Sequence, residues 1–156
     1  LTRRLDQEYA QLRGRYVVYL LNQYPQKALR VQTESGSVEA AHSTAVGKAI
    51  LSCLPEDEVR SLFEGVAMER YTESTLTTIE ELLEDLARAR DLGYATDRGE
   101  QTPGIGCLAA PVRDATSMVV AAVGVSGPES RVFAGGSGPG EEVLACASAV
   151  ERALGD

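Results

Sequence analysis

The sequence predicts an α+β domain built on a mainly antiparallel sheet. Two observations predict this class. Segments with the apolar and β-branched residues typical of strands come first and return late in the chain. Segments with the apolar spacing of amphipathic helices lie between them and at the end. This order is typical of α+β proteins, in which the helices are segregated on one face of the sheet. At 156 residues, the chain fits a single domain.

The composition indicates a globular protein and excludes several classes of function. With 15 basic and 23 acidic side chains, the net charge is −8, which argues against direct binding of nucleic acid or anionic membranes by this chain. Three cysteines without a C-x-x-C motif, and one histidine, exclude a disulfide framework and a zinc ribbon. No apolar run approaches the ~18–20 residues of a membrane span. We expect a cytoplasmic protein without a metal or other cofactor.

The first strands are expected around a hairpin turn at Arg13-Gly14. Residues 16–21 are β-branched, aromatic and aliphatic, as in a strand. Residues 1–13 fit either a helix or a strand. Alternation of apolar and polar residues predicts a half-buried strand over 28–33.

Three helices are expected in the middle of the chain. Each has a capping residue followed by apolar residues at helical spacing. The first helix is predicted by Ser43 or Thr44 as its cap, followed by an apolar stripe of Val46, Ala49, Ile50 and Cys53. The second begins with Pro55 at its first position and ends at Gly65. The third begins with a capping box of Thr78 and Glu81 and ends at Gly93. The third of these helices is the longest.

The last third of the chain is expected to form strands followed by a helix. Strands are expected over 94–97, 107–112 and 118–126, the last of them central in the sheet and ended by Gly127-Pro128. Pro111 requires an edge or a bulge. Residues 135–140 (GGSGPG) predict a flexible loop before a helix over 141–154. The residues expected to face inward from that helix are Val143, Leu144, Ala147, Val150 and Leu154.

Two phosphate-binding motifs are matched only in part. Gly104-Ile-Gly106-Cys-Leu-Ala109 fits the dinucleotide fingerprint, but a strand rather than the required helix follows it. Gly47-Lys48 lacks the first glycine and the final Ser or Thr of a P-loop. We therefore expect neither site.

Several polar residues have both a structural and a functional interpretation. Cys107 is either a small buried side chain, a polar contact in a pocket, or a nucleophile with His42 as its base. Asp97 and Ser126 stand where strands end, so ordinary turn chemistry also explains them. The free N–H groups at the helix start near Ser43 would attract a carboxylate without any basic side chain.

The order of these residues resembles a known family. The blocks that carry the resemblance are HSTAVGKAIL (42–51), YT (71–72) with TLT (75–77), GYATD (93–97), PGIGCLAAPV (103–112) and VSGP (125–128) with SR (130–131). Over residues 14–154 they resemble the C-terminal effector-binding domain of the IclR (isocitrate lyase regulator) family of bacterial transcription factors. The resemblance implies a GAF-like fold, in which helices flank a curved, mainly antiparallel sheet. It also implies a homodimer or homotetramer, and operator DNA bound by an N-terminal winged helix-turn-helix domain that is absent from this chain.

The resemblance also implies a pocket for a small organic acid. In the family the ligand contacts backbone N–H groups in the turn after the histidine, here Ala45 and Val46. The other positions that the resemblance carries over are Asp97, Cys107 and Ser126 as polar contacts and Ile105 as an apolar wall. Some members have a second serine where this chain has Gly124, so the pocket is expected to lose a hydroxyl and gain space.

Three functions are compatible with these residues. The first is a ligand sensor of a transcriptional regulator, which is not an enzyme. The second is a GAF-like enzyme that uses Cys107 as its nucleophile and His42 as its base. The third is an oligomerisation module without a ligand. Binding of small acids separates the first from the third, and turnover that depends on Cys107 would identify the second.

Overall fold

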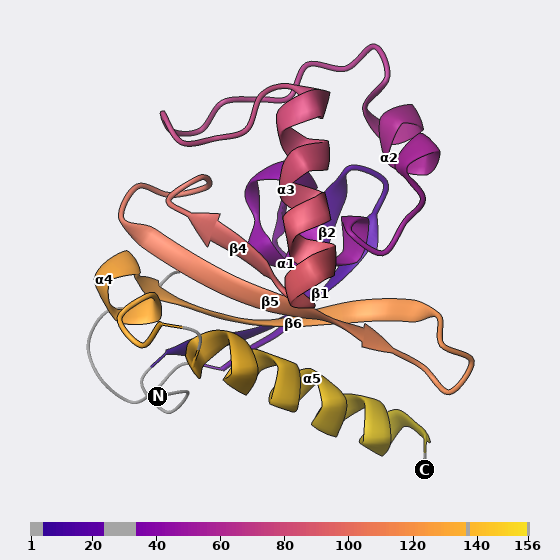
Figure 1. Ribbon diagram of the computed structural model, residues 1–156, viewed down its shortest axis with the longest axis vertical. Coiled ribbons are helices and arrows are strands. Elements are labelled where there is room, and N and C mark those ends of the chain that lie inside the picture. The colour runs from indigo at the N-terminus through magenta and orange to yellow at the C-terminus, as the bar shows by residue number, and fades with distance from the viewer. Residues whose placement is uncertain (1–4, 24–33, 137, 156) are drawn as a thin grey trace.

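The computed structural model describes residues 5–23, 34–136 and 138–155. Within them, six strands form one antiparallel sheet in the order β3-β2-β1-β6-β5-β4 (Figure 1). The strands are β1 (Asp6–Arg13), β2 (Tyr16–Gln23), β3 (Val38–Ala40), β4 (Ala95–Arg98), β5 (Ile105–Arg113) and β6 (Val119–Pro128). The helices are the 3₁₀ turn η2 (Ala41–Ser43), α1 (Ala45–Leu51), α2 (Glu56–Phe63), α3 (Ile79–Leu92), α4 (Glu129–Val132) and α5 (Gly138–Gly155).

The helices cover both faces of this curved sheet. Helices α1, α2 and α3 lie on one face, and α4 and α5 lie on the other (Figure 1). The α+β class and the antiparallel sheet are confirmed, whereas the expectation of helices on one face is wrong. The cause lies in the central strands, because six consecutive residues of β6, 122–127, are buried. A strand that is apolar on both sides needs cover on both sides.

The N-terminal segment is a strand, which decides the alternative left open by the sequence. β1 pairs with β2 through the expected hairpin and with β6 on its other side. It therefore joins the two halves of the sheet. The strand predicted over 28–33 lies outside the described residues, and the short strand β3 was not predicted.

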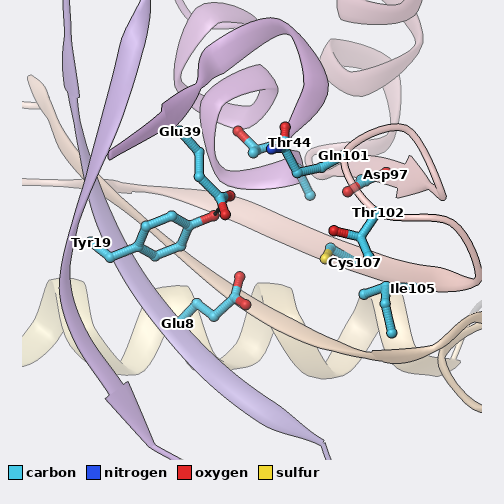
Figure 2. Close-up of a pocket in the computed structure, with 10 residues that line it drawn as sticks. Glu8, Tyr19, Glu39, Thr44, Asp97, Gln101, Thr102, Ile105 and Cys107 are labelled. Atoms are coloured by element: carbon cyan, nitrogen blue, oxygen red, sulfur yellow. Dashed lines mark hydrogen bonds between the residues drawn. The ribbon is translucent and has the colours of Figure 1, made fainter. Parts of the chain in front are cut away.

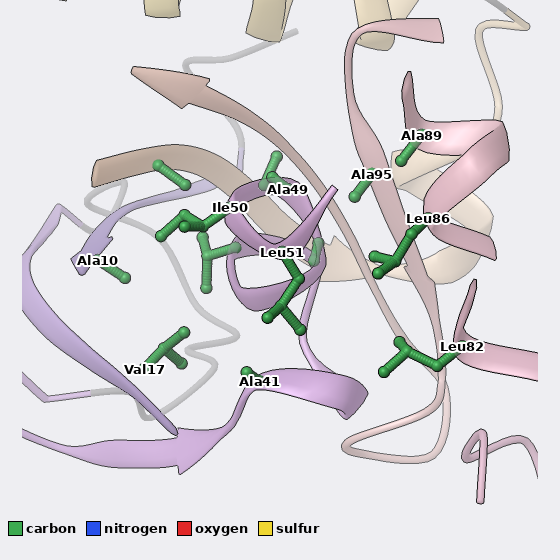
Figure 3. Close-up of a cluster of buried hydrophobic side chains, with 14 of the residues drawn as sticks. Ala10, Val17, Ala41, Ala49, Ile50, Leu51, Leu82, Leu86, Ala89 and Ala95 are labelled. Atoms are coloured by element: carbon green, nitrogen blue, oxygen red, sulfur yellow. The ribbon is translucent and has the colours of Figure 1, made fainter. Parts of the chain in front are cut away.

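Helix α1 is the centre of the larger core (Figure 3). All seven of its residues are buried, and the Thr44 side chain caps it by accepting a hydrogen bond from Gly47 N, as predicted. A Cβ atom at Gly47 would lie 2.4 Å from Ala41 O. Glycine here therefore allows η2 to pack directly against α1, which sets the position of the start of the helix.

The local signals of the other two predicted helices are largely confirmed. In α3, Thr78 and Glu81 form the capping box, and Gly93 ends the helix in the left-handed conformation. Leu82 and Leu86 are fully buried on the inner face of α3. Helix α2 starts one residue later than predicted, since Pro55 is its N-cap rather than its first helical residue.

The C-terminal third departs from the prediction at three points. Gly127 and Pro128 continue β6 and lead directly into α4, so they do not end the strand. Gly138 and the two residues after it form the first turn of α5 instead of a loop. Leu154 is exposed, since α5 extends past the sheet. Pro111 lies beyond the part of β5 that pairs with β4, where no hydrogen bond to that strand is lost.

Candidate functional site

A small cavity lies where the start of α1 faces the sheet (Figure 2). Its volume is about 20 Å³, enough space for roughly one water molecule. Strands β1 to β5, the start of α1 and the turn after β4 all contribute to it. The residues that line it are Glu8, Tyr19, Glu39, Thr44, Ala45, Asp97, Gln101, Thr102, Ile105 and Cys107.

Four of the six residues predicted for the site line this cavity, and two do not. Asp97, Cys107, Ile105 and Ala45 are the four. Val46 is 1% exposed and packs in the core of α1. Ser126 is fully buried behind the cavity, where its hydroxyl donates to Glu8 Oε1 at 2.6 Å. The contact of all six residues with a ligand stays a prediction.

The strand register explains why three distant polar residues come together. Asp97 lies opposite Cys107 across β4 and β5, and Cys107 lies opposite Ser126 across β5 and β6. Directly opposite residues in an antiparallel pair point to the same face. These residues therefore form one row across three strands, on the face covered by α1.

Six lining residues were missed, and the acidic ones matter most. Glu8 and Glu39 enter the cavity with Asp97, so three carboxyl groups converge there, and no lining residue is basic (Figure 2). Tyr19 donates from its hydroxyl to Glu39 Oε2 at 2.9 Å. Glu8 was missed because residues 1–13 had no assigned strand. Only the placement of β1 in the sheet shows that Asp6, Glu8 and Ala10 form the buried side of this strand.

Burial changes the protonation of the cavity's carboxyl groups. Desolvation raises the pKa of Glu8 to about 7, against a partial lowering by the hydrogen bond from Ser126. Desolvation also raises the pKa of Asp97 to about 7, although the Glu100 backbone N–H donates to Asp97 Oδ1 at 2.7 Å. Burial raises the pKa of Glu39 as well. Near neutral pH, Glu8 and Asp97 can therefore either donate or accept a hydrogen bond.

The geometry does not favour a nucleophilic Cys107. Burial and the nearby carboxyl groups raise the pKa of its thiol well above the usual range, so the thiol stays protonated. His42 does not line the cavity. Its Nε2 lies 2.9 Å from the Glu69 carbonyl oxygen, and its ring packs beside Phe63 and Tyr71. The structure therefore does not bring the proposed nucleophile and base together.

Lys48 holds the turn that completes the cavity. Its ammonium group is fully buried and donates to Asp85 Oδ2 at 2.7 Å and to Glu100 Oε2 at 2.6 Å. Since Glu100 also binds Asp97 through its backbone N–H, Lys48 links α1 and α3 to the site. The Gly47-Lys48 pair thus has a packing and an ionic role in place of the rejected phosphate-binding one.

Gly124 does not enlarge the cavity. It is not among the lining residues, and a Cβ atom there would lie 3.1 Å from Leu108 O and 3.2 Å from Val46 Cγ1. Neighbouring atoms already fill the space that the missing serine was expected to leave. The expectation of a roomier pocket is wrong for this reason.

Comparison with known proteins identifies the family. The family model described as the bacterial transcriptional regulator IclR C-terminal domain matches residues 4–152. The chain belongs to the IclR family. One curated relative, the HTH-type transcriptional regulator BhcR of Paracoccus denitrificans, is 35% identical over 121 residues. That match covers 78% of this chain and 43% of BhcR, so the matched region spans less than half the length of this relative.

Solved structures of IclR-type regulators share the whole fold. The repressor BlcR of Agobacterium tumefaciens superposes with a TM-score of 0.89 at 27% identity, over 99% of this chain and 61% of BlcR. A double mutant of the inducer-binding domain of PobR from Acinetobacter gives a TM-score of 0.80 at 25% identity, over 94% of this chain and 87% of that domain. No helix in the described ranges combines the length and apolar character needed to cross a membrane. Those ranges also contain no group of three or more His, Cys, Asp or Glu side chains that could hold a metal ion.

Proposed function

We propose that this chain is the effector-sensing domain of its regulator, and that a small organic acid binds in the cavity beside α1. One observation carries the proposal: buried and half-buried polar side chains from four strands and one turn converge on a single cavity. Buried polar groups that point into a cavity without a full set of protein partners are typical of ligand sites. Among the described residues, those meeting here include Glu8, Tyr19, Glu39, Asp97 and Gln101.

The favoured effector has a carboxylate and a nearby hydroxyl or hydrated carbonyl group. Its carboxylate would face Ala45 at the start of α1, which lines the cavity. Its hydroxyl would donate to Asp97 or Glu8. A double mutant of the PobR inducer-binding domain was crystallised with 3-hydroxybenzoic acid, which has both groups, and this supports the ligand class.

The rest of the regulator is proposed from the family. We infer that residues 1–156 form one effector domain and that a winged helix-turn-helix domain outside this chain binds operator DNA. The effector would shift the population of arrangements in a homodimer or homotetramer, and with it the spacing of the DNA-binding domains. In this function the domain senses a ligand and does not turn it over.

Substitutions in the cavity are expected to weaken effector binding about tenfold or more, since a hydrogen bond to a charged group contributes roughly 1.5–3 kcal/mol. Thermal shift measurements with glycolate, lactate, glycerate, pyruvate and 3-hydroxybenzoate first select the acid that stabilises the protein most. Calorimetric titration then compares Asp97→Asn and Cys107→Ser with the wild type. Asp91→Asn and Cys146→Ser, which make the same chemical changes outside the cavity, are the matched controls.

Each alternative function has its own signature in this experiment. If none of the acids stabilises the protein, the sensing proposal is wrong and the oligomerisation module is favoured. If an acid binds but the two cavity variants bind it as tightly as the wild type, the proposed site is wrong. Conversion of an acid to a product, abolished by Cys107→Ser, would indicate the enzyme.

A further inference from the structure

The cavity is smaller than the acids proposed to fill it. Its volume of about 20 Å³ holds roughly one water, whereas pockets for small molecules measure about 300–1,000 Å³. Five of the lining residues are buried below 5% exposure, and these are Glu8, Tyr19, Thr44, Ala45 and Asp97. Part of the wall must therefore move before any acid can enter.

The turn between β4 and β5 is the thinnest part of that wall. Thr102 is the one exposed residue among those that line the cavity in the described chain, and Pro103 and Gly104 beside it are exposed too. Gly99 and Gly104, at φ +70° and +76°, stand at the two ends of the turn. Glycine readily adopts such backbone conformations, which let the chain turn from β4 into β5.

Backbone hydrogen bonds hold this turn at Gly104, whose carbonyl oxygen accepts from Glu129 N at 2.9 Å, and at Thr102, whose carbonyl oxygen accepts from Ile105 N at 3.2 Å. Its side chains are held less firmly. Lys48 and Thr75 fix Glu100, through its carboxylate and its carbonyl oxygen. Ile105 already belongs to β5. Between them, the side-chain anchor that the structure shows is the hydrogen bond between the Ser43 hydroxyl and Gln101 Oε1. Ser43 is fully buried in η2, so it is a fixed partner for Gln101.

We propose that the side chains of Gln101 and Thr102 form a gate over the cavity and that the Ser43–Gln101 hydrogen bond is its latch. Opening swings the Gln101 and Thr102 side chains outward about the fixed Glu100, while the Lys48 ion pairs stay intact. The use of the gate for effector access rests on the proposed function. The gate itself is a property of the unliganded protein and is measurable without any effector.

Alkylation of Cys107 by iodoacetamide reports on the gate, because this thiol lines the cavity. Cys53 and Cys146 are free cysteines elsewhere and serve as internal controls for general unfolding. We expect Cys107 to be alkylated about fivefold faster in Gln101→Ala than in the wild type. This factor corresponds to the loss of one hydrogen bond of about 1 kcal/mol. The rates at Cys53 and Cys146, followed by peptide mass spectrometry, should stay unchanged.

A double-mutant cycle tests the latch itself. Ser43→Ala alone is expected to accelerate Cys107 alkylation, but to add nothing in the Gln101→Ala background, because the bond is already absent. An unchanged Cys107 rate in both single variants would overturn the gate. The gate would also be overturned if Ser43→Ala accelerated Cys107 alkylation in the Gln101→Ala background as much as it does alone. Equal acceleration of alkylation at all three cysteines would overturn it too. If the gate is found but no acid binds, the proposed function fails and the gate stands.

Discussion

Urea unfolding at pH 5 and pH 8 is expected to show that the domain is more stable at the lower pH. Glu8 and Asp97 have pKa values of about 7 in the folded protein, against 4.5 and 3.8 ordinarily. Between these values the folded state binds more protons than the unfolded state. The stabilisation is therefore complete below about pH 4 and is lost as the pH rises through 7. Each group accounts for a change on the order of 3 kcal/mol.

The charges facing these two groups explain why both titrate so high. Glu8 is faced by Glu39 and Asp97 as well as by its strand neighbour Asp6, all of which favour its neutral form. Asp97 is faced by Glu100, which raises its pKa, and by Lys48, which lowers it. In both residues desolvation is the largest cause, so the effect depends on burial in a closed cavity.

The Glu8→Gln/Asp97→Asn double variant is the control for this pH dependence. It removes Glu8 and Asp97 and leaves Glu39, whose raised pKa acts in the same sense, and His42, whose lowered pKa acts in the opposite sense between pH 5 and pH 8. We expect its stability to change less between pH 5 and pH 8, or to rise. The same steep loss in the variant and the wild type would contradict the assigned protonation states.

Replacement of Lys48 by methionine is expected to cost about 3–5 kcal/mol of unfolding free energy at pH 8, because it leaves buried carboxylates without their counter-charge. Lys48 is fully buried, and the side chains of Asp85 and Glu100 are only 14% and 10% exposed. Burial already raises the pKa of Glu100. Part of the loss should therefore be recovered at pH 5, where this carboxyl binds a proton more readily.

Arg88→Met is the matched control, since Arg88 also pairs with Asp85 but is 58% exposed. An exposed ion pair contributes only about 0–1 kcal/mol, so this variant should unfold almost as the wild type does. Urea unfolding of the two variants at pH 8 and pH 5 makes the comparison. Equal small losses would show that the Lys48 network contributes little. A large loss that does not depend on pH would point to packing rather than charge.

Local sequence signals predicted the secondary structure well. The Thr78–Glu81 capping box, the Thr44 cap and the hairpin at Gly14 depend on residues within one turn of each other. The interactions that form these elements therefore all lie between residues close together in the sequence. The wrong predictions at Gly127 and Gly138 have one cause. Turn-forming residues at both places were taken to end an element, whereas β6 continues through Gly127 and α5 begins at Gly138.

The candidate site was only partly predictable because it depends on strand register. Asp97 and Cys107 were predicted because they stand in the sequence blocks that resemble the family. In the structure they lie opposite each other across β4 and β5. Glu8 enters the site only because β1 lies between β2 and β6, which no local pattern indicates. The second layer of helices was missed for the same reason, because the sequence of a buried strand does not indicate which helix covers which of its faces.

Carbon-13 NMR of the Glu8 and Asp97 carboxyl carbons tests effector binding in the cavity most directly. The acid that stabilises the protein most is titrated in, and assignments come from Glu8→Gln and Asp97→Asn. We expect both signals to shift with the dissociation constant found by calorimetry, while the signals of exposed Glu56 and Asp57 stay in place. Saturable binding that leaves both cavity carboxyls unmoved would contradict a ligand site beside α1.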